Sequence, residues 1–186
     1  MTWDLNGQRL ITGSSDGYIR VSKISLLADN WLQIYSLEQA GLSKKPIEVR
    51  LHNDEITDIV WDPTSESNFY TSARDKSIKK WDVNTKLSNP VTFGKSREEN
   101  INLAISPDGK QLAVSNNKDE LFFYDVKVSL DKHVRPIKMK SDINSFSWDK
   151  GEGRLFFIND QNGIITILDG HTYDNSRIAL SDCHTG

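Results

Sequence analysis

The sequence has one cysteine, no long apolar run and no excess of basic residues. With Cys183 alone, this chain can form neither an internal disulfide nor a zinc site built from several thiolates. No stretch approaches the ~18 consecutive apolar residues that a membrane-spanning helix needs. The start, MTWDLNGQRL, also lacks the basic and then apolar layout of a signal peptide. We therefore expect a soluble intracellular protein.

The net charge of the chain argues against nucleic acid as a partner that is bound mainly by bulk positive charge. The 23 Lys and Arg residues against 26 Asp and Glu residues give a net charge of −3. A protein held to nucleic acid mainly by bulk positive charge would carry the opposite sign. Local basic patches remain compatible with this composition.

The same pattern recurs along the chain at a nearly constant interval. Each copy has an alternating apolar strand, a turn, a second strand, a tight turn and a third strand that ends in an apolar or aromatic residue. First-strand anchors lie 58, 44 and 43 residues apart, at Trp3, Trp61, Ile105 and Trp148. Third-strand ends lie 59, 43 and 44 residues apart, at Ser22, Trp81, Tyr124 and Leu168. Two independent landmarks thus give one period near 43.

This period predicts an all-β fold, the four-stranded blades of a β-propeller. Gly and Asn stand at the expected tight turns, in Asp16-Gly17 and Asn162-Gly163. Outer strands are expected at 47–51, 90–94, 135–139 and 177–180. The predicted blades cover about 1–51 with an insertion at 25–46, 52–94, 96–139 and 141–180, and residues 181–186 begin a fifth. Four blades fall short of the about seven of a typical ring, so we expect a piece of a larger propeller that does not fold stably alone.

Blade two carries a polar signature that resembles the WD-repeat family. His52 precedes the first strand, Thr71 lies in the second, Asp75 lies in the tight turn and Trp81 closes the third. The resemblance implies a hydrogen-bonded relay of these four side chains that locks the blade and does not catalyse. A buried carboxylate needs a partner, and the imidazole and indole N–H groups need one too. The other blades depart from the signature, at Ser22-Lys23, Lys118 and Leu168, and are expected to depend more on apolar packing.

Residues 99–127 and 142–169 are similar to a narrower group, the third subunits of the THO complex. The similarity lies in Glu99 to Asn102, the Ser106 to Lys110 turn and the Phe156-Phe157 strand. It implies a nuclear scaffold subunit of THO and of the larger TREX assembly, which couples transcription elongation to mRNA packaging and export. The implied partners are other THO subunits and mRNA-export factors. No correspondence is found for residues 25–46.

Catalytic, metal and cofactor sites find no support in the sequence. Gly94-Lys95-Ser96 ends like a phosphate-binding loop, but position 89, where the leading glycine of that motif would fall, holds Asn89. The segment also joins two predicted strands and does not open a helix. The four histidines, His52, His133, His171 and His184, have no partner at metal-ligand spacing. We expect no enzyme activity, no metal and no cofactor.

Two further binding functions stay open at this point. Lys76, Lys79 and Lys80 cluster around one predicted strand and would supply weak RNA contacts, although interleaved Asp and Glu favour a solvated rim and indirect RNA association. A reader of short peptides would instead gather aromatic or acidic residues from several blades at the mouth of the central channel.

The insertion at 25–46 is rich in apolar and aromatic residues. Apolar residues at 27, 31, 34 and 35 recur near the helical period, which predicts a short amphipathic segment. The candidate partner-binding residues in it are Trp31, Leu32, Ile34 and Tyr35. A blade has no spare core position for them. They pack over the outer strand of blade one or dock on another subunit, and the second alternative makes this a candidate partner-binding segment.

Overall fold

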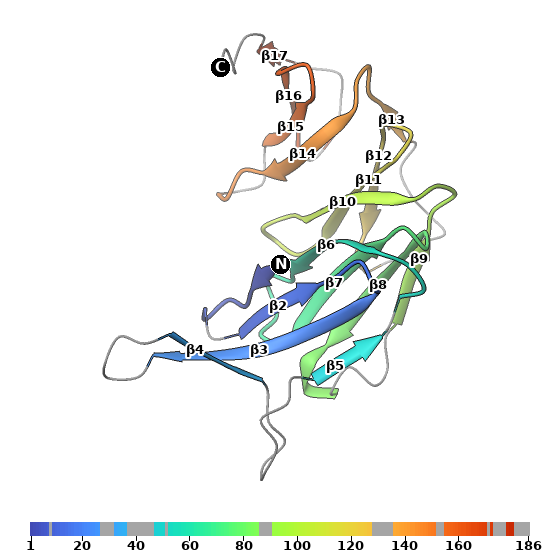
Figure 1. The fold of residues 1–186 in the computed structure, drawn as a ribbon. Helices are drawn as coiled ribbons and strands as arrows, with labels where there is room; N and C mark the ends of the chain where they lie inside the picture. The colour runs from blue at the N-terminus through green and yellow to red at the C-terminus, as the bar shows by residue number, and fades with distance from the viewer. Residues whose placement is uncertain are drawn as a thin grey trace.

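The computed structural model of the chain consists of antiparallel β-strands in four separate sheets (Figure 1). It describes residues 1–7, 9–26, 32–36, 47–50, 52–85, 91–127, 136–151, 155–170, 172 and 178–180. These residues contain no α-helix, only one turn of 3-10 helix at Val83–Thr85. In this part of the chain, no helix is long and apolar enough to cross a membrane. The predicted all-β class is confirmed.

Each sheet is antiparallel, and we call the sheets blades one to four. Blades two to four are meanders, whereas in blade one both β4 and β5 pair with β3. Blade one comprises β1 (Thr2–Trp3), β2 (Arg9–Gly13), β3 (Tyr18–Leu26), β4 (Leu32–Ser36) and β5 (Ile47–Arg50). Blade two comprises β6 (Ile56–Trp61), β7 (Asn68–Ala73), β8 (Ser77–Asp82) and β9 (Val91–Lys95). Blade three comprises β10 (Asn100–Ile105), β11 (Gln111–Asn116), β12 (Glu120–Asp125) and β13 (Ile137–Lys138). Blade four comprises β14 (Ile143–Trp148), β15 (Leu155–Asp160), β16 (Ile165–Asp169) and β17 (Ile178–Leu180).

The core lies in layers between neighbouring blades. Blades one and two share the cluster Ile11, Ile19, Ile56, Ile59, Trp61, Phe69, Trp81 and Val83. Blades two and three share Tyr70, Ile78, Leu103, Leu112, Val114 and Tyr124. Blades three and four share Ala113, Leu121, Phe123, Met139, Ile143, Trp148, Phe156, Ile158 and Leu168. Because side chains alternate between the two faces of a strand, each middle blade contributes one face to each of two layers.

The inner strands of three blades share an irregularity of register. The pairing shifts between Ile56 and Asp58 in β6, between Asn100 and Asn102 in β10, and between Ile143 and Ser145 in β14. A bulge at the same place in each repeat re-aims the following side chain. Asp58, Asn102 and Ser145 therefore occupy equivalent positions in successive blades.

The expectation of a helical segment in the insertion is wrong for residues 32–36. Leu32, Ile34 and Tyr35 lie in β4, which pairs with Ser22–Leu26 at the end of β3. The first part of β3 pairs with β5 instead, so the long strand has two partners end to end. The unpaired backbone groups of β3 favour an extended partner over a helix, and the apolar residues of β4 at 32 and 34 also fit an alternating strand. Trp31 lies outside the described residues, as do residues 181–186.

Candidate functional site: the polar relay of blade two

The side chains of Trp81, Thr71 and His52 form a buried chain of hydrogen bonds between β8, β7 and the segment before β6. The indole Nε1 of Trp81 donates to the Thr71 Oγ1, at 2.8 Å. Thr71 Oγ1 in turn lies 2.7 Å from His52 Nε2. Because an indole N–H can only donate, the threonine hydroxyl accepts from Trp81, and its own hydrogen is available for the histidine nitrogen.

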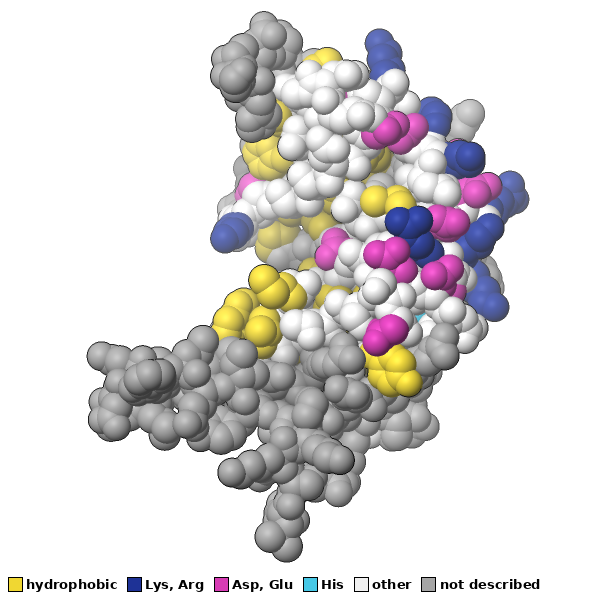
Figure 2. Space-filling view, in the orientation of Figure 1, with side chains coloured by type: hydrophobic (Ala, Val, Ile, Leu, Met, Phe, Trp, Pro, Cys, Tyr) yellow, Lys and Arg dark blue, Asp and Glu magenta, His cyan; other side chains and the backbone are white. Residues whose placement is uncertain are grey.

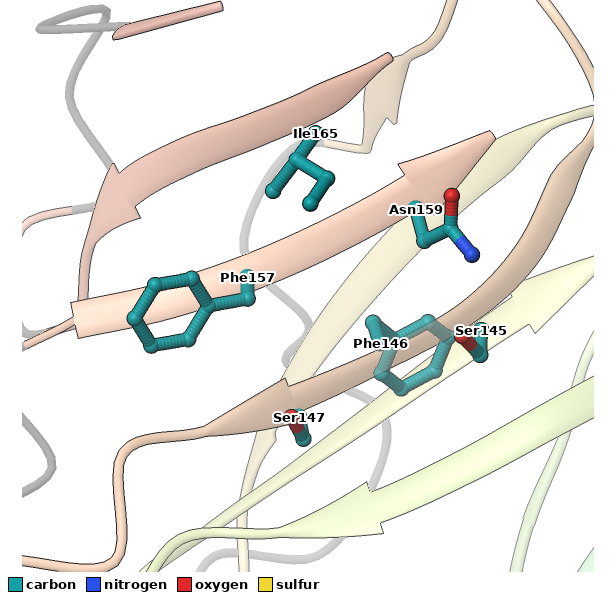
Figure 3. A pocket seen from close by; sticks show the side chains of 6 residues that line it. All are labelled: Ser145, Phe146, Ser147, Phe157, Asn159 and Ile165. Carbon is teal, nitrogen blue, oxygen red and sulfur yellow. The ribbon is translucent and has the colours of Figure 1, made fainter. Parts of the chain in front are cut away.

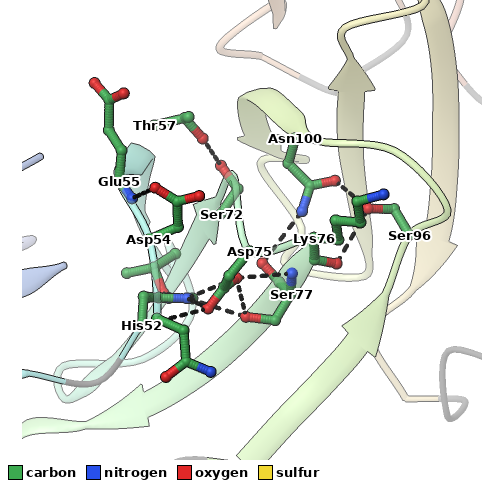
Figure 4. A network of polar contacts seen from close by, with 12 residues as sticks. His52, Asp54, Glu55, Thr57, Ser72, Asp75, Lys76, Ser77, Ser96 and Asn100 are labelled. Atoms are coloured by element: carbon green, nitrogen blue, oxygen red, sulfur yellow. Dashed lines mark hydrogen bonds and ion pairs between the residues drawn. The ribbon is translucent and has the colours of Figure 1, made fainter.

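The carboxylate of Asp75 accepts the last hydrogen bond of this series, from His52. This residue lies in the tight turn between β7 and β8, and its Oδ2 is 3.0 Å from His52 Nδ1 (Figure 4). The carboxylate also accepts the backbone N–H of Asn53 at 2.9 Å and that of Ser77 at 2.9 Å. Because an ionised carboxylate can only accept, a ring hydrogen of His52 belongs on Nδ1 and points to Asp75, and in the neutral ring Nε2 then accepts from Thr71. The donors thus run in one direction, from Trp81 through Thr71 and His52 to Asp75.

These hydrogen bonds control the ionisation of Asp75. Burial by itself raises the pKa of this carboxyl, but the hydrogen bonds from His52, from Ser77 and from the backbone of Asn53 outweigh it. The net effect holds the pKa of Asp75 well below its ordinary value. The turn therefore contains a carboxylate that is ionised at neutral pH and fully hydrogen-bonded.

Ser77 is part of the same network, and reasoning from the sequence missed it. Its hydroxyl lies 2.6 Å from Asp75 Oδ1 and 3.0 Å from His52 Nδ1. Its carbonyl accepts a hydrogen bond from Asn100 Nδ2, at 3.2 Å, across the boundary between blades two and three (Figure 4). Ser96 Oγ donates to Asn100 Oδ1, at 2.7 Å. A serine two residues after a turn aspartate is the sequence signal that could have indicated its role.

The burial of this network decides what it can do chemically. His52, Thr71, Ser77 and Asn100 are all buried, and the ring of Trp81 packs on Phe69. A serine, a histidine and an aspartate therefore meet here, and the residues that carry the two hydroxyl groups are buried. In the described part of the chain, no group of three or more His, Cys, Asp or Glu side chains has the arrangement of a metal site. The geometry is that of an internal clamp.

The corresponding turns of blades three and four are capped by a different residue. Asn116 Oδ1 accepts the backbone N–H groups of Lys118 and Glu120, at 2.9 and 3.1 Å. Asp160 Oδ1 accepts those of Asn162 and Ile164, at 2.9 and 3.0 Å. In both blades the cap stands at the end of the second strand, two residues before the position of Asp75. Polar capping therefore accompanies the apolar packing expected for these blades.

Lys76, which follows Asp75, has an unusual backbone conformation. Its φ is +67°, in the left-handed region, and Asp119 has the equivalent conformation in blade three with a φ of +58°. Gly17 and Gly163 stand at this position in blades one and four, with φ of +81° and +73°. A lysine here adopts a conformation that glycine reaches without a Cβ clash.

The three lysines proposed to contact RNA do not form one patch. Lys76 Nζ donates to the carbonyl of Arg97 at 2.8 Å. Lys79 and Lys80 are consecutive residues of β8, so their side chains leave opposite faces of the strand. Lys80 Nζ lies over the ring of Tyr70, 5.5 Å from its centroid, so a cation–π contact holds an ammonium that would otherwise extend into solvent.

Acidic residues accompany the basic residues on the outer surface. Figure 2 shows Lys and Arg side chains along one edge of the described surface with Asp and Glu side chains between them. Arg74 pairs with Glu55 at 2.8 Å and with Glu99 at 3.4 Å. Lys110 pairs with Asp108 at 3.0 Å. This edge is consequently a mixed surface and not a continuous basic one.

The described part of the candidate partner-binding segment, residues 25–26 and 32–36, extends blade one at its outer side. The paired ends of β3 and β4 form a two-stranded ribbon that projects from the blade (Figure 1). We call Ser22–Leu26 and Leu32–Ser36 the ribbon of blade one.

A mostly apolar cavity of about 430 Å³ lies where the inner strands β6, β10 and β14 end. Its lining comprises Ile59, Val60, Pro63, Leu103, Ala104, Ile105, Pro107, Ser147, Trp148, Asp149 and Lys150. Residues from three blades thus converge here, as a binding site for an apolar side chain requires.

Comparison with known proteins agrees with the fold. Residues 1–21 and 44–82 match the family described as WD domain, G-beta repeat. The chain therefore contains WD repeats. It is 31% identical over 170 residues to THO complex subunit 3 of Arabidopsis thaliana, covering 90% of this chain and 48% of that protein. It is 26% identical over 170 residues to WD repeat-containing protein AAC3 of Dictyostelium discoideum, covering 88% of this chain and 35% of that protein.

The WD-repeat chain therefore spans about half the length of the first relative and about a third of the second. The matched WD segments contain the relay residues His52, Thr71, Asp75 and Trp81 of blade two.

Proposed function

We propose that this protein is a non-enzymatic scaffold subunit of a THO-type complex in the nucleus. There it would serve the coupling of transcription elongation to mRNA packaging and export, with other THO subunits and export factors as partners. The observation that carries the proposal is the 31% identity to THO complex subunit 3 across 90% of the chain. The buried relay supports a scaffold because it stabilises a blade and exposes no reactive group.

The proposed mechanism is the presentation of fixed loops and edges by stiff blades. The layers between the blades and the relay of blade two hold the sheets in one arrangement, so partners meet a preformed surface. Affinity would come from a few apolar or aromatic anchors. We assign this role to the ribbon of blade one and its neighbour Trp31, with Leu32, Ile34 and Tyr35 as the anchors on β4.

The test is affinity purification of the tagged full-length protein from nuclear extract, followed by mass spectrometry. We expect THO subunits and mRNA-export factors to co-purify. A triple substitution in the ribbon, Leu32→Ser, Ile34→Ser and Tyr35→Ser, is expected to remove at least one of them. Val91→Ser on the exposed outer strand of blade two is the matched control and should remove none.

The possible results separate the two parts of the proposal. If the intact protein captures no mRNA-export subunit, the THO assignment is wrong. If the ribbon variant retains every partner, only the role of the ribbon is wrong.

A second candidate function is the capture of a short peptide, and the cavity between β6, β10 and β14 favours it. Its apolar walls suit a bulky aliphatic or aromatic side chain. The Ala104→Phe variant would fill the cavity, so it should abolish binding of such a peptide, whereas Val91→Ser should not. Unchanged binding in the Ala104→Phe variant would exclude this cavity as the site.

A further inference from the structure

Two tryptophans occupy the same position in blades two and four but differ in their hydrogen bonding. Trp61 pairs with Phe69 and Trp148 pairs with Phe156, so each closes the inner strand of its blade. Trp61 Nε1 donates to the backbone carbonyl of Ser65, at 2.7 Å, in the loop that follows β6. Trp148 Nε1 is buried and has no hydrogen-bond partner in the structure. The indole N–H of blade four therefore lacks the acceptor that blade two supplies.

The surroundings of Trp148 make this missing acceptor costly. Trp148 is 6% exposed, and its ring packs on Phe123 and Phe156, with centroids 6.1 and 4.7 Å apart. A buried donor without an acceptor costs free energy, so such a group in a native protein calls for a reason. In blade two the chain itself satisfies the equivalent indole, so the unpaired donor is not a general property of this position.

Trp148 also lines the apolar cavity of about 430 Å³ at the ends of β6, β10 and β14. This volume lies in the range of about 300–1,000 Å³ that is typical of sites for small ligands. Val60, Ala104 and Ser147 also line the cavity, and they stand at one register position of the three inner strands. The small side chains of Ala104 and Ser147 leave space beside the tryptophan.

A second cavity, of about 460 Å³, lies on blade four alone (Figure 3). It is lined by Ser145, Phe146, Ser147, Phe157, Asn159 and Ile165. The buried atom without a partner in this lining is Asn159 Oδ1, which is an acceptor. Only the cavity beside Trp148 gathers residues from three blades around an unpaired donor, and this convergence favours it as the binding site.

The charges at this cavity favour an anionic ligand. Lys150 lines the cavity, is exposed and has no ion pair in the part of the chain that the structure describes. Asp149 lines the cavity too, but it corresponds to Asp62, whose carboxylate accepts the backbone N–H and the hydroxyl of Thr64 in its own turn. Asp149 likewise interacts within the chain. The charge that is left for a ligand is therefore that of the Lys150 ammonium.

We propose that this cavity binds an extended acidic peptide of a partner protein through three kinds of contact. A bulky aliphatic side chain of the peptide fills the space between Val60, Ala104 and Ser147. A neighbouring main-chain carbonyl accepts the hydrogen bond of Trp148 Nε1, and a carboxylate of the peptide faces Lys150. A peptide combines these three groups within a few residues. This inference rests on the second candidate function, peptide capture at this cavity, and adds the chemistry that selects the peptide.

The test uses the blocked peptide acetyl-Glu-Glu-Leu-Glu-Glu-amide and the full-length protein. Two reference peptides replace the leucine by alanine or all glutamates by lysine, and calorimetric titration measures each affinity. We expect both reference peptides to bind at least about tenfold more weakly than the leucine peptide. Because the peptide carboxylate faces Lys150, the Lys150→Glu variant should reverse the preference between the glutamate and the lysine peptides.

The role of the indole N–H is tested by a matched pair of variants. Trp148→Phe keeps an aromatic ring but removes the donor, so it should weaken binding of the leucine peptide about fivefold to tenfold. Trp61→Phe loses the hydrogen bond to the Ser65 carbonyl within the chain. It should therefore lower the melting temperature more than Trp148→Phe does and change the peptide affinity much less.

Nuclear magnetic resonance of the wild-type protein gives a readout that a purely structural role of Trp148 would not affect. The indole N–H signal of Trp148 is assigned by its absence from Trp148→Phe. We expect this signal to move when the leucine peptide is added. The indole signal of Trp81, which donates to Thr71, should stay in place.

The outcomes separate this inference from the second candidate function. Selective binding of the leucine peptide with a moving Trp148 signal supports the inference. If the peptide binds and Ala104→Phe abolishes the binding, but the Trp148 signal stays in place, peptide capture stands and the inference is overturned. A preference that Lys150→Glu leaves unchanged also overturns it. Absence of binding by all three peptides, or binding that persists in Ala104→Phe, overturns both.

Discussion

The indole nitrogen of Trp81 donates a hydrogen bond to the hydroxyl oxygen of Thr71, at 2.8 Å. The same hydroxyl also contacts His52 in this buried network. Trp81 pairs with Phe69 in the β7–β8 ladder, so its side chain lies on the face that also carries Thr71. The hydroxyl accepts from one ring and donates to another, which is a task that no apolar side chain of the same shape can perform.

Thr71→Val is therefore expected to destabilise the protein more than Thr71→Ser. Valine keeps the shape of threonine but leaves the indole N–H and the imidazole nitrogen unpaired, at a cost of about 1–3 kcal/mol. Serine keeps the hydroxyl and loses only a methyl group. Chemical denaturation of the full-length protein measures both variants. Equal losses of unfolding free energy for the two would contradict the relay.

Asp75 is expected to make stability depend on pH in the acid range. Its pKa is lower in the folded than in the unfolded chain, so its contribution is fully present above the ordinary carboxyl pKa of about 3.9. The contribution is lost as the pH falls below that value towards the folded pKa. The difference in unfolding free energy between wild type and Asp75→Asn should thus shrink as the pH is lowered from about 5 to about 3. A difference that stays constant over this range would exclude the ionised carboxylate as the cause.

Lys76→Gly is expected to stabilise the protein. Glycine removes the Cβ clash of a left-handed residue, which costs about 1–2 kcal/mol. The lost hydrogen bond to the Arg97 carbonyl is exposed and offsets only part of this gain. The matched control is Lys79→Gly, in the middle of β8, which should destabilise because its backbone is extended. Thermal melting of both variants compares them, and a lower melting temperature for Lys76→Gly would refute the strain argument.

Replacing Lys76, Lys79 and Lys80 together by alanine is expected to leave RNA affinity nearly unchanged. The three ammonium groups do not share one surface, and the outer edge of the described surface is mixed in charge. Binding of the full-length protein to a single-stranded RNA is measured at several salt concentrations. A marked drop in affinity with a shallower salt dependence would instead place these lysines in a phosphate-binding site.

Sequence spacing was sufficient to predict the all-β class, because strand alternation and repeat length are local patterns. Alternation sets the faces of each strand, and a His, Thr, Asp and Trp at fixed offsets reach one another once the strands pair. The role of Ser77 was missed because its hydrogen bond to Asn100 joins residues of different blades. The strand β4 was missed because the edge of β3 that it pairs with exists only after the fold has formed. Contacts of this kind depend on neighbours that no local pattern contains.

The bond between blades two and three predicts a difference between two substitutions of Asn100. Its side chain is fully buried, donates to the Ser77 carbonyl and accepts from Ser96 Oγ. In Asn100→Asp the hydrogen bond from Ser96 Oγ is kept, but a carboxylate oxygen then faces the Ser77 carbonyl. Two buried acceptors would meet without a donor between them, so the free energy of unfolding should fall by about 2–4 kcal/mol. Asn100→Ser keeps a small donor and should lose less. Asn144→Asp, an exposed position in β14, is the control. Hydrogen exchange of the β8 amides should rise most in Asn100→Asp, and an increase confined to blade three would show that the bond does not hold the two blades together.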